Sequence, residues 1–87
     1  MSEYVMICRG WADGRICEWE GFYLKSFTPF DKIKGEWTPS LDEAKKYPSL
    51  IAASEEWRFA IGTRPDSRPD RPLTAFSIEI LPVERIH

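Results

Sequence analysis

The sequence contains few of the side chains that carry catalysis or hold metal ions. Its 87 residues include one histidine, His87 at the C-terminal end, and two cysteines, Cys8 and Cys17. A serine or cysteine nucleophile needs a general base beside it, and a histidine at a frayed chain end is poorly placed for that role. The cysteines form no Cys-x-x-Cys pair and have no second cluster, so their spacing does not indicate a zinc site. We therefore expect no enzymatic activity, no metal and no cofactor.

Long apolar runs, clustered glycines and a strong net charge are also missing. No segment approaches the roughly 18 apolar residues that a membrane helix needs, and no basic stretch leads into an apolar run at the N-terminus. The five glycines are scattered, which does not fit a phosphate-binding loop. The net charge of -2 gives no long-range attraction to nucleic acid. We expect a cytoplasmic protein, monomeric or weakly dimeric, with free thiols and no membrane or nucleic-acid partner.

Large side chains are abundant, as a single small domain over residues 1–87 requires. The chain holds 4 Trp, 5 Phe and 3 Tyr, which together make up 14% of it. Such a short chain buries only about 60 to 65% of the surface that it exposes when unfolded, so each buried residue must remove much apolar area from water. We therefore expect most of the aromatic rings to form the core.

The first half of the chain has the pattern of antiparallel strands. An apolar strand over Tyr4–Cys8 precedes the pair Asp13-Gly14, which favours a tight hairpin turn. With these two residues as the loop, the hairpin pairs Arg9 with Glu18 and Cys8 with Trp19. A strand with aromatic residues on both faces follows at Phe22–Phe27, and "GEWT" at 35–38 is long enough for another short strand.

Two helices and a closing strand are predicted in the second half. Ser40 and Glu43 fit a capping box for a helix that Pro48 ends, and Ser49 can cap a second helix that Gly62 ends. In the second helix the residues expected to face the core are Leu50, Ala53, Trp57 and Ala60, and those expected to face outward are Glu55, Glu56 and Arg58. In the last strand Phe76, Ile78 and Ile80 alternate with Ser77 and Glu79. We expect an α+β fold, with four to five antiparallel strands covered on one side by two short helices.

The segment "TRPDSRPDRPL" at 63–73 repeats an Arg-Pro pair three times. Its local charge is too small to follow a phosphate backbone unless Arg64, Arg68 and Arg71 all point to one side. Pro69 and Pro72 form a PxxP, but the flanking basic residue that such ligands use is absent. We interpret the segment first as a stiff connection into the last strand, and second as a contact loop that presents its arginines.

Other exposed groups remain as candidates for binding. The neighbouring carboxylates Glu55 and Glu56 are better explained as solvated surface than as an acid-base pair. Trp11 lies beside the Asp13-Gly14 turn, where it either folds back over the sheet or stands out as an anchor for a partner. The candidate protein-binding residues are Trp11, Asp13, Glu55, Glu56, Arg64, Arg68 and Arg71.

The chain resembles small proteins that are common in bacteriophage and prophage genomes. The resemblance rests on "YVMI", "GFYLKSF", "EWT" followed by Ala44 and Tyr47, the Ser-started helix and "RPLTAFSIEILPV", and it extends from Tyr4 to Val83. That class includes inhibitors of host defence such as anti-CRISPR proteins. The resemblance implies a phage-type accessory protein that acts by binding a bacterial host protein or complex, and it assigns no site residue. The alternative is a small nucleic-acid-binding domain that uses the Arg-rich loop.

Overall fold

The computed structural model describes residues 3–28, 32–59, 62–63, 69–70 and 72–86. Six strands are described, namely β1 (Tyr4–Trp11), β2 (Tyr23–Thr28), β3 (Lys32–Thr38), β4 (Gly62–Thr63), β5 (Pro69–Asp70) and β6 (Phe76–Pro82). The helical elements are α1 (Leu50–Trp57) and three short 3-10 turns, η1 (Leu41–Glu43), η2 (Pro72–Ala75) and η3 (Val83–Arg85). The α+β class is therefore confirmed.

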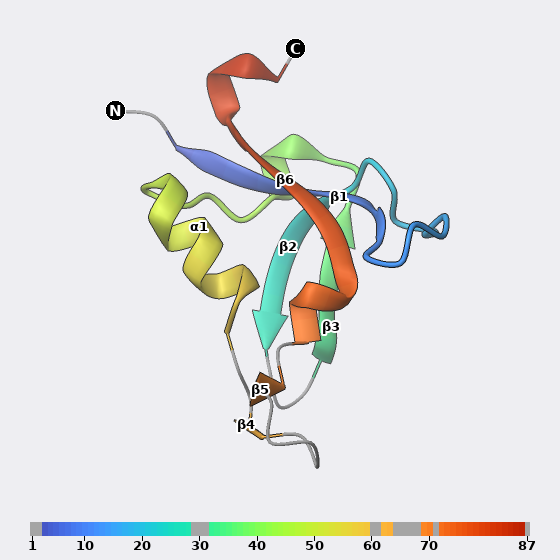
Figure 1. The fold of residues 1–87 in the computed structure, drawn as a ribbon. Coiled ribbons are helices and arrows are strands. Elements are labelled where there is room, and N and C mark those ends of the chain that lie inside the picture. The colour runs from blue at the N-terminus through green and yellow to red at the C-terminus, as the bar shows by residue number, and fades with distance from the viewer. Residues whose placement is uncertain (1–2, 29–31, 60–61, 64–68, 71, 87) are drawn as a thin grey trace.

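The main sheet has four antiparallel strands in the order β3-β2-β1-β6 (Figure 1). The last strand of the chain therefore pairs with the first, from Tyr4 opposite Pro82 to Trp11 opposite Phe76. The short strands β4 and β5 pair only with each other, so the main sheet gains no fifth strand from the described residues.

Strand β1 is buried on both of its faces, which explains its continuous apolar sequence. Met6 and Cys8 point into the larger core cluster, together with Leu24, Leu73 and Phe76. Val5 and Ile7 point to the opposite face, where they pack in a smaller cluster. The residues around that smaller cluster are Tyr23, Leu41, Ala44, Leu81, Val83 and Ile86. The sheet is therefore covered on both faces at β1, and the expected coverage on one face alone is wrong for this strand.

The predicted hairpin is only partly correct. A tight turn forms there, but Asp13-Gly14 is not its two-residue loop: the N–H of Gly14 donates to the Trp11 carbonyl and the N–H of Trp11 donates to the Arg15 carbonyl, so the loop spans residues 12–14. The pairs predicted from it, Arg9 with Glu18 and Cys8 with Trp19, are wrong. The chain returns to β1 later, because the N–H of Cys8 donates to the Phe22 carbonyl at 2.9 Å and the N–H of Gly21 donates to the Cys8 carbonyl at 2.7 Å. Residues 12–22 therefore form a long loop, which we call the β1–β2 loop.

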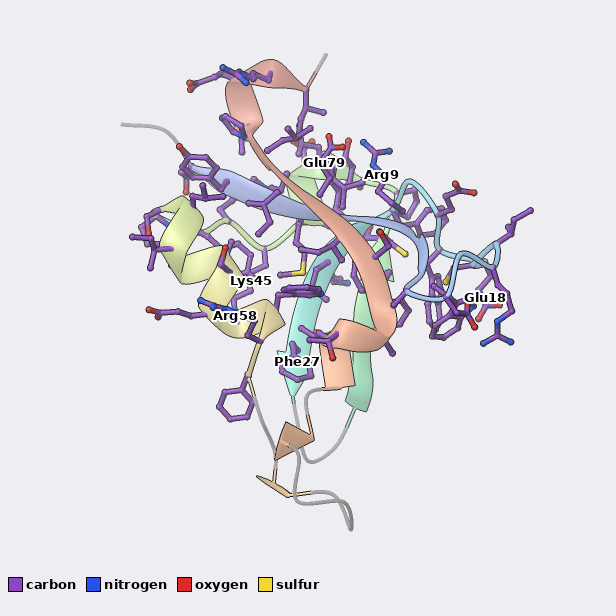
Figure 2. The ribbon with its side chains drawn as sticks, in the orientation of Figure 1. Arg9, Glu18, Phe27, Lys45, Arg58 and Glu79 are labelled. Atoms are coloured by element: carbon purple, nitrogen blue, oxygen red, sulfur yellow. The ribbon has the colours of Figure 1, made fainter. Side chains whose placement is uncertain are left out.

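Arg9 pairs across the other edge of β1. Its guanidinium lies 3.4 Å from the carboxylate of Glu79 on β6, where both side chains are exposed (Figure 2). An exposed ion pair of this kind contributes little to stability, about 0 to 1 kcal/mol. The alternation predicted for the last strand is confirmed, because Phe76 is buried, Ser77 and Glu79 are exposed, and Ile78 packs against the larger cluster.

The first predicted helix is shorter than expected. Only η1 forms there, and the Ser40 side chain makes no cap hydrogen bond. The hydroxyl of Thr38 bonds both partners of the predicted capping box instead. It accepts from the Ser40 N–H at 3.1 Å and donates to the Glu43 carboxylate at 2.8 Å. The chain then becomes extended, and Tyr47 forms a two-way backbone bridge with Tyr4. That bridge ends the helical turn well before Pro48.

The second predicted helix forms as α1 and begins where expected. The Ser49 hydroxyl accepts from the backbone N–H of Ala52 at 3.1 Å, as an N-cap residue does. The helix ends at Trp57, so the predicted end at Gly62 is wrong, and Gly62 lies in β4. Ala53 is buried and Trp57 packs against the larger cluster, but Leu50 is half exposed and not a core residue. Ala60 lies outside the described residues.

Candidate functional site

The two predicted site residues at the first turn differ in exposure. The Trp11 ring stacks on Phe76, with the ring centroids 4.8 Å apart, so it folds back over the sheet and is half buried. Asp13 is exposed and accepts hydrogen bonds from the backbone N–H and the guanidinium of Arg15, at 3.0 and 2.6 Å. The bond from the backbone, followed by that from the side chain, lowers the pKa of the Asp13 carboxyl. Asp13 therefore holds the turn as well as facing solvent.

The two predicted glutamates of α1 have different environments. Glu55 is exposed, whereas Glu56 is half buried and points away from the outer face of the helix. Both oxygens of Glu56 accept from the Lys45 ammonium, at 2.8 and 2.7 Å, and one of them also accepts from the Tyr47 hydroxyl at 2.6 Å. Burial, followed by this hydrogen bond, raises the pKa of Tyr47. Glu56 thus ties α1 to the segment before it, and the prediction that it faces outward is wrong.

We expect Glu56→Gln to lower the free energy of unfolding by about 1 kcal/mol, because the amide retains an acceptor for Tyr47 but loses the charge that pairs with Lys45. Urea unfolding followed by tryptophan fluorescence measures the change. The matched control is Glu55→Gln on the exposed face, which should unfold as the parent does. Equal midpoints for both variants and the parent would show that the Lys45 contact contributes nothing.

The remaining predicted residues, Arg64, Arg68 and Arg71, lie outside the described residues. Those that are described do not form one surface. The β1–β2 loop with Asp13 follows the C-terminal end of β1, whereas α1 lies near the N-terminal end of β1 (Figure 1). Trp11 nevertheless packs against the same larger core cluster that contains Ala53 of α1. A single partner patch that joins the first turn to α1 would therefore have to extend along the whole length of β1.

The exposed apolar side chains indicate whether the β1–β2 loop or α1 is better suited to binding a partner. Among the described residues, the exposed large apolar side chains are Ile16, Leu50, Ile51 and Phe59. Ile16 stands alone in the β1–β2 loop, whereas the other three lie on α1 or immediately after it. We call Leu50, Ile51, Glu55 and Phe59 the α1 surface. Exposed apolar residues that cluster mark interaction sites more often than residues that are scattered singly.

The α1 surface follows from the geometry of a short helix. Residues three and four apart share a helix face, so Ile51 and Glu55 lie on the side opposite Ala53, which is fully buried. Phe59 follows the helix and meets the Phe27 ring edge-on, with the centroids 6.2 Å apart. The sequence contained one signal for this surface. Ile51 falls between the predicted core positions Leu50 and Ala53 and one helical turn before Glu55, so an apolar side chain was placed on the outward face.

A pocket of about 380 Å³ lies along the end of β3 and was not predicted from the sequence. Its lining includes the side chains of Trp19, Lys25, Glu36, Trp37, Thr38 and Glu43. The rings of Trp19 and Trp37 each pack against Phe76, with centroids 5.9 and 5.1 Å away, and both residues are half buried. No short motif contains these residues, because three separate segments of the chain bring them together.

Other kinds of site find no support within the part of the chain that the structure covers. There, no three His, Cys, Asp or Glu residues gather as a metal site would require. Over the same residues, no helix has the length and apolar character to cross a membrane. Cys8 and Cys17 are both buried and both free thiols.

No family model matches the chain, and no curated protein or solved structure is similar to it.

Proposed function

We propose that this chain is a non-enzymatic binding protein that occupies a surface of a bacterial protein complex through the α1 surface. The observation that carries the proposal is that three of the four exposed large apolar side chains among the described residues lie within residues 50–59: Ile51 is 68% exposed, Leu50 50% and Phe59 44%. Each exposes apolar area to water, although so small a domain needs its apolar side chains for the core. A partner that covers these side chains would remove that area from water.

The charged groups around the α1 surface fit a protein partner. Glu55 and Arg58 are both exposed on the same side of α1 as Ile51, and the guanidinium of Arg58 donates to the Ser54 carbonyl at 3.4 Å. An apolar centre with charges of both signs at its rim is the usual composition of a protein interface. The bacterial host complex as partner follows from the resemblance to phage accessory proteins, and inhibition of a defence complex such as a CRISPR effector is one role within that proposal.

We expect Ile51→Asp to weaken binding at least about tenfold, because it places a charge at the centre of the apolar contact. The measurement is a pull-down from nuclease-treated bacterial lysate with the tagged chain, followed by titration of the captured protein. The matched control is Ile16→Asp, which makes the same change at an exposed isoleucine of the β1–β2 loop, away from α1. Melting curves of both variants should match that of the parent, since neither side chain is buried.

Two results would contradict the proposal. If Ile16→Asp loses the partner while Ile51→Asp keeps it, the β1–β2 loop is the interface. If the parent retains only material that nuclease removes, the chain is a nucleic-acid-binding domain and the Arg-rich segment becomes the site to test.

A further inference from the structure

The pocket beside β3 has a fixed aromatic wall. Trp19 comes from the β1–β2 loop and Trp37 from β3, and both rings are tilted against the buried ring of Phe76, at 55° and 58°. Contact with the core therefore fixes the position of both rings, and the ring surface that does not contact the core lines the pocket. The face of an indole carries negative electrostatic potential and attracts cations that approach within about 6 Å.

The charged groups of the pocket favour a cation as well. The Glu43 carboxylate is positioned by the Thr38 hydroxyl at 2.8 Å, and that hydroxyl is itself fixed by the Ser40 N–H. Glu36 lines the same pocket, and so does the cationic side chain of Lys25. The Glu43 carboxylate is therefore a counter-charge for a cation that lies against the indole rings.

We propose that this pocket binds an organic cation, either a substituted ammonium or a guanidinium group, against Trp19 and Trp37 with Glu43 as the counter-charge. The volume of about 380 Å³ lies at the lower end of the range for ligand pockets and suits such a group. The cation can come from a free small molecule or from a side chain of another protein. The site is separate from the α1 surface and its test is independent of the proposed function.

The experiment titrates the whole chain and follows its tryptophan indole N–H signals by nuclear magnetic resonance. One arm uses choline, and its control is the neutral analogue in which a tert-butyl group replaces the trimethylammonium group. The other arm uses N-acetylarginine amide, and its control is the corresponding citrulline derivative. We expect saturable shifts at Trp19 and Trp37 with at least one cation, and binding about tenfold weaker for its neutral partner. The Trp57 signal serves as an internal control, because its indole N–H is buried away from this pocket.

Two charge variants should change the affinity in opposite directions. Glu43→Gln keeps an acceptor for Thr38 and should weaken cation binding several-fold, whereas Lys25→Gln removes the opposing charge and should strengthen it. Both side chains are exposed, so neither variant should disturb folding. Saturation by choline alone identifies a free ammonium compound as the ligand, and saturation by the arginine derivative alone identifies a protein side chain.

Three results would overturn the proposal. Equal binding of a cation and its neutral partner would show an apolar pocket without charge selectivity. No saturable shift with any cation would show that the pocket does not bind this class. Weaker binding after Lys25→Gln would show that the ligand is an anion.

Discussion

Phe76→Ala should lower the free energy of unfolding by about 3 to 5 kcal/mol, which is a large part of the roughly 5 to 10 kcal/mol expected for a domain of this size. Phe76 is fully buried, and the rings of Trp11, Trp19 and Trp37 all pack against it. Removing its ring leaves a cavity that three large side chains cannot fill without moving. Urea unfolding followed by tryptophan fluorescence measures the loss.

Two further variants make the result specific to Phe76. Phe76→Leu retains much of the volume and should cost clearly less than alanine. Ser77→Ala changes the adjacent exposed residue on the opposite face of β6 and should leave the unfolding midpoint where it was. A loss of less than about 1 kcal/mol for Phe76→Ala would contradict the central position that the structure gives to this ring.

Alkaline pH should destabilise the chain through Cys8. Burial raises the pKa of the Cys8 thiol from 9.0 to about 11, against a lowering by a backbone hydrogen bond with Gly10 and with a further rise from the neighbouring Cys17. A group whose pKa is raised by folding contributes stability that is fully present below its unfolded pKa and is lost as the pH rises through its folded pKa. The free energy of unfolding should therefore fall by about 2 kcal/mol between pH 9 and pH 11 from this thiol alone.

Cys8→Ala removes the titrating group and is the direct test. Its unfolding free energy, measured at intervals across the same pH range, should fall less steeply than that of the parent. Part of the decline should remain at the upper end, because the pKa of Tyr47 is also raised in the folded state and acts in the same direction. Identical slopes for Cys8→Ala and the parent would show that the thiol is not protected from ionisation by its burial.

The features of the fold that depend on local sequence could be predicted. The alternation of Phe76, Ser77 and Ile78 identified the last strand, and Ser49 marked the start of α1. Both signals lie within a few residues of the element that they define. The α+β class followed from the order of these elements along the chain.

The features that depend on long-range contacts could not be predicted. The hairpin register failed because Cys8 bonds to Phe22 and Gly21 at the far end of the β1–β2 loop, while Trp11 turns inward to Phe76. The capping box at Ser40 failed because Thr38, placed by the end of β3, supplies the hydroxyl instead. In each case the local pairing or cap that the sequence predicted is replaced by a contact that depends on the sheet.

The candidate sites show the same division. Glu55 was predicted to be exposed and is, whereas Glu56 beside it is drawn inward by Lys45 and Tyr47 from outside the helix. The pocket could not be found from the sequence, because Trp19 and Trp37 each fit the pattern of a core residue. Their exposed surfaces appear only when the β1–β2 loop is placed beside β3.

The proposal that the α1 surface is the protein-binding site is tested most directly by photo-crosslinking in bacterial cells. A photo-reactive residue replaces Ile51 in one form of the chain and Ile16 in another, so that both exposed isoleucine positions are sampled under the same conditions. We predict a discrete protein adduct from position 51 and none from position 16. An adduct from position 16 alone, or none from either position while the tagged parent still captures its partner, would contradict the assignment of the interface to α1.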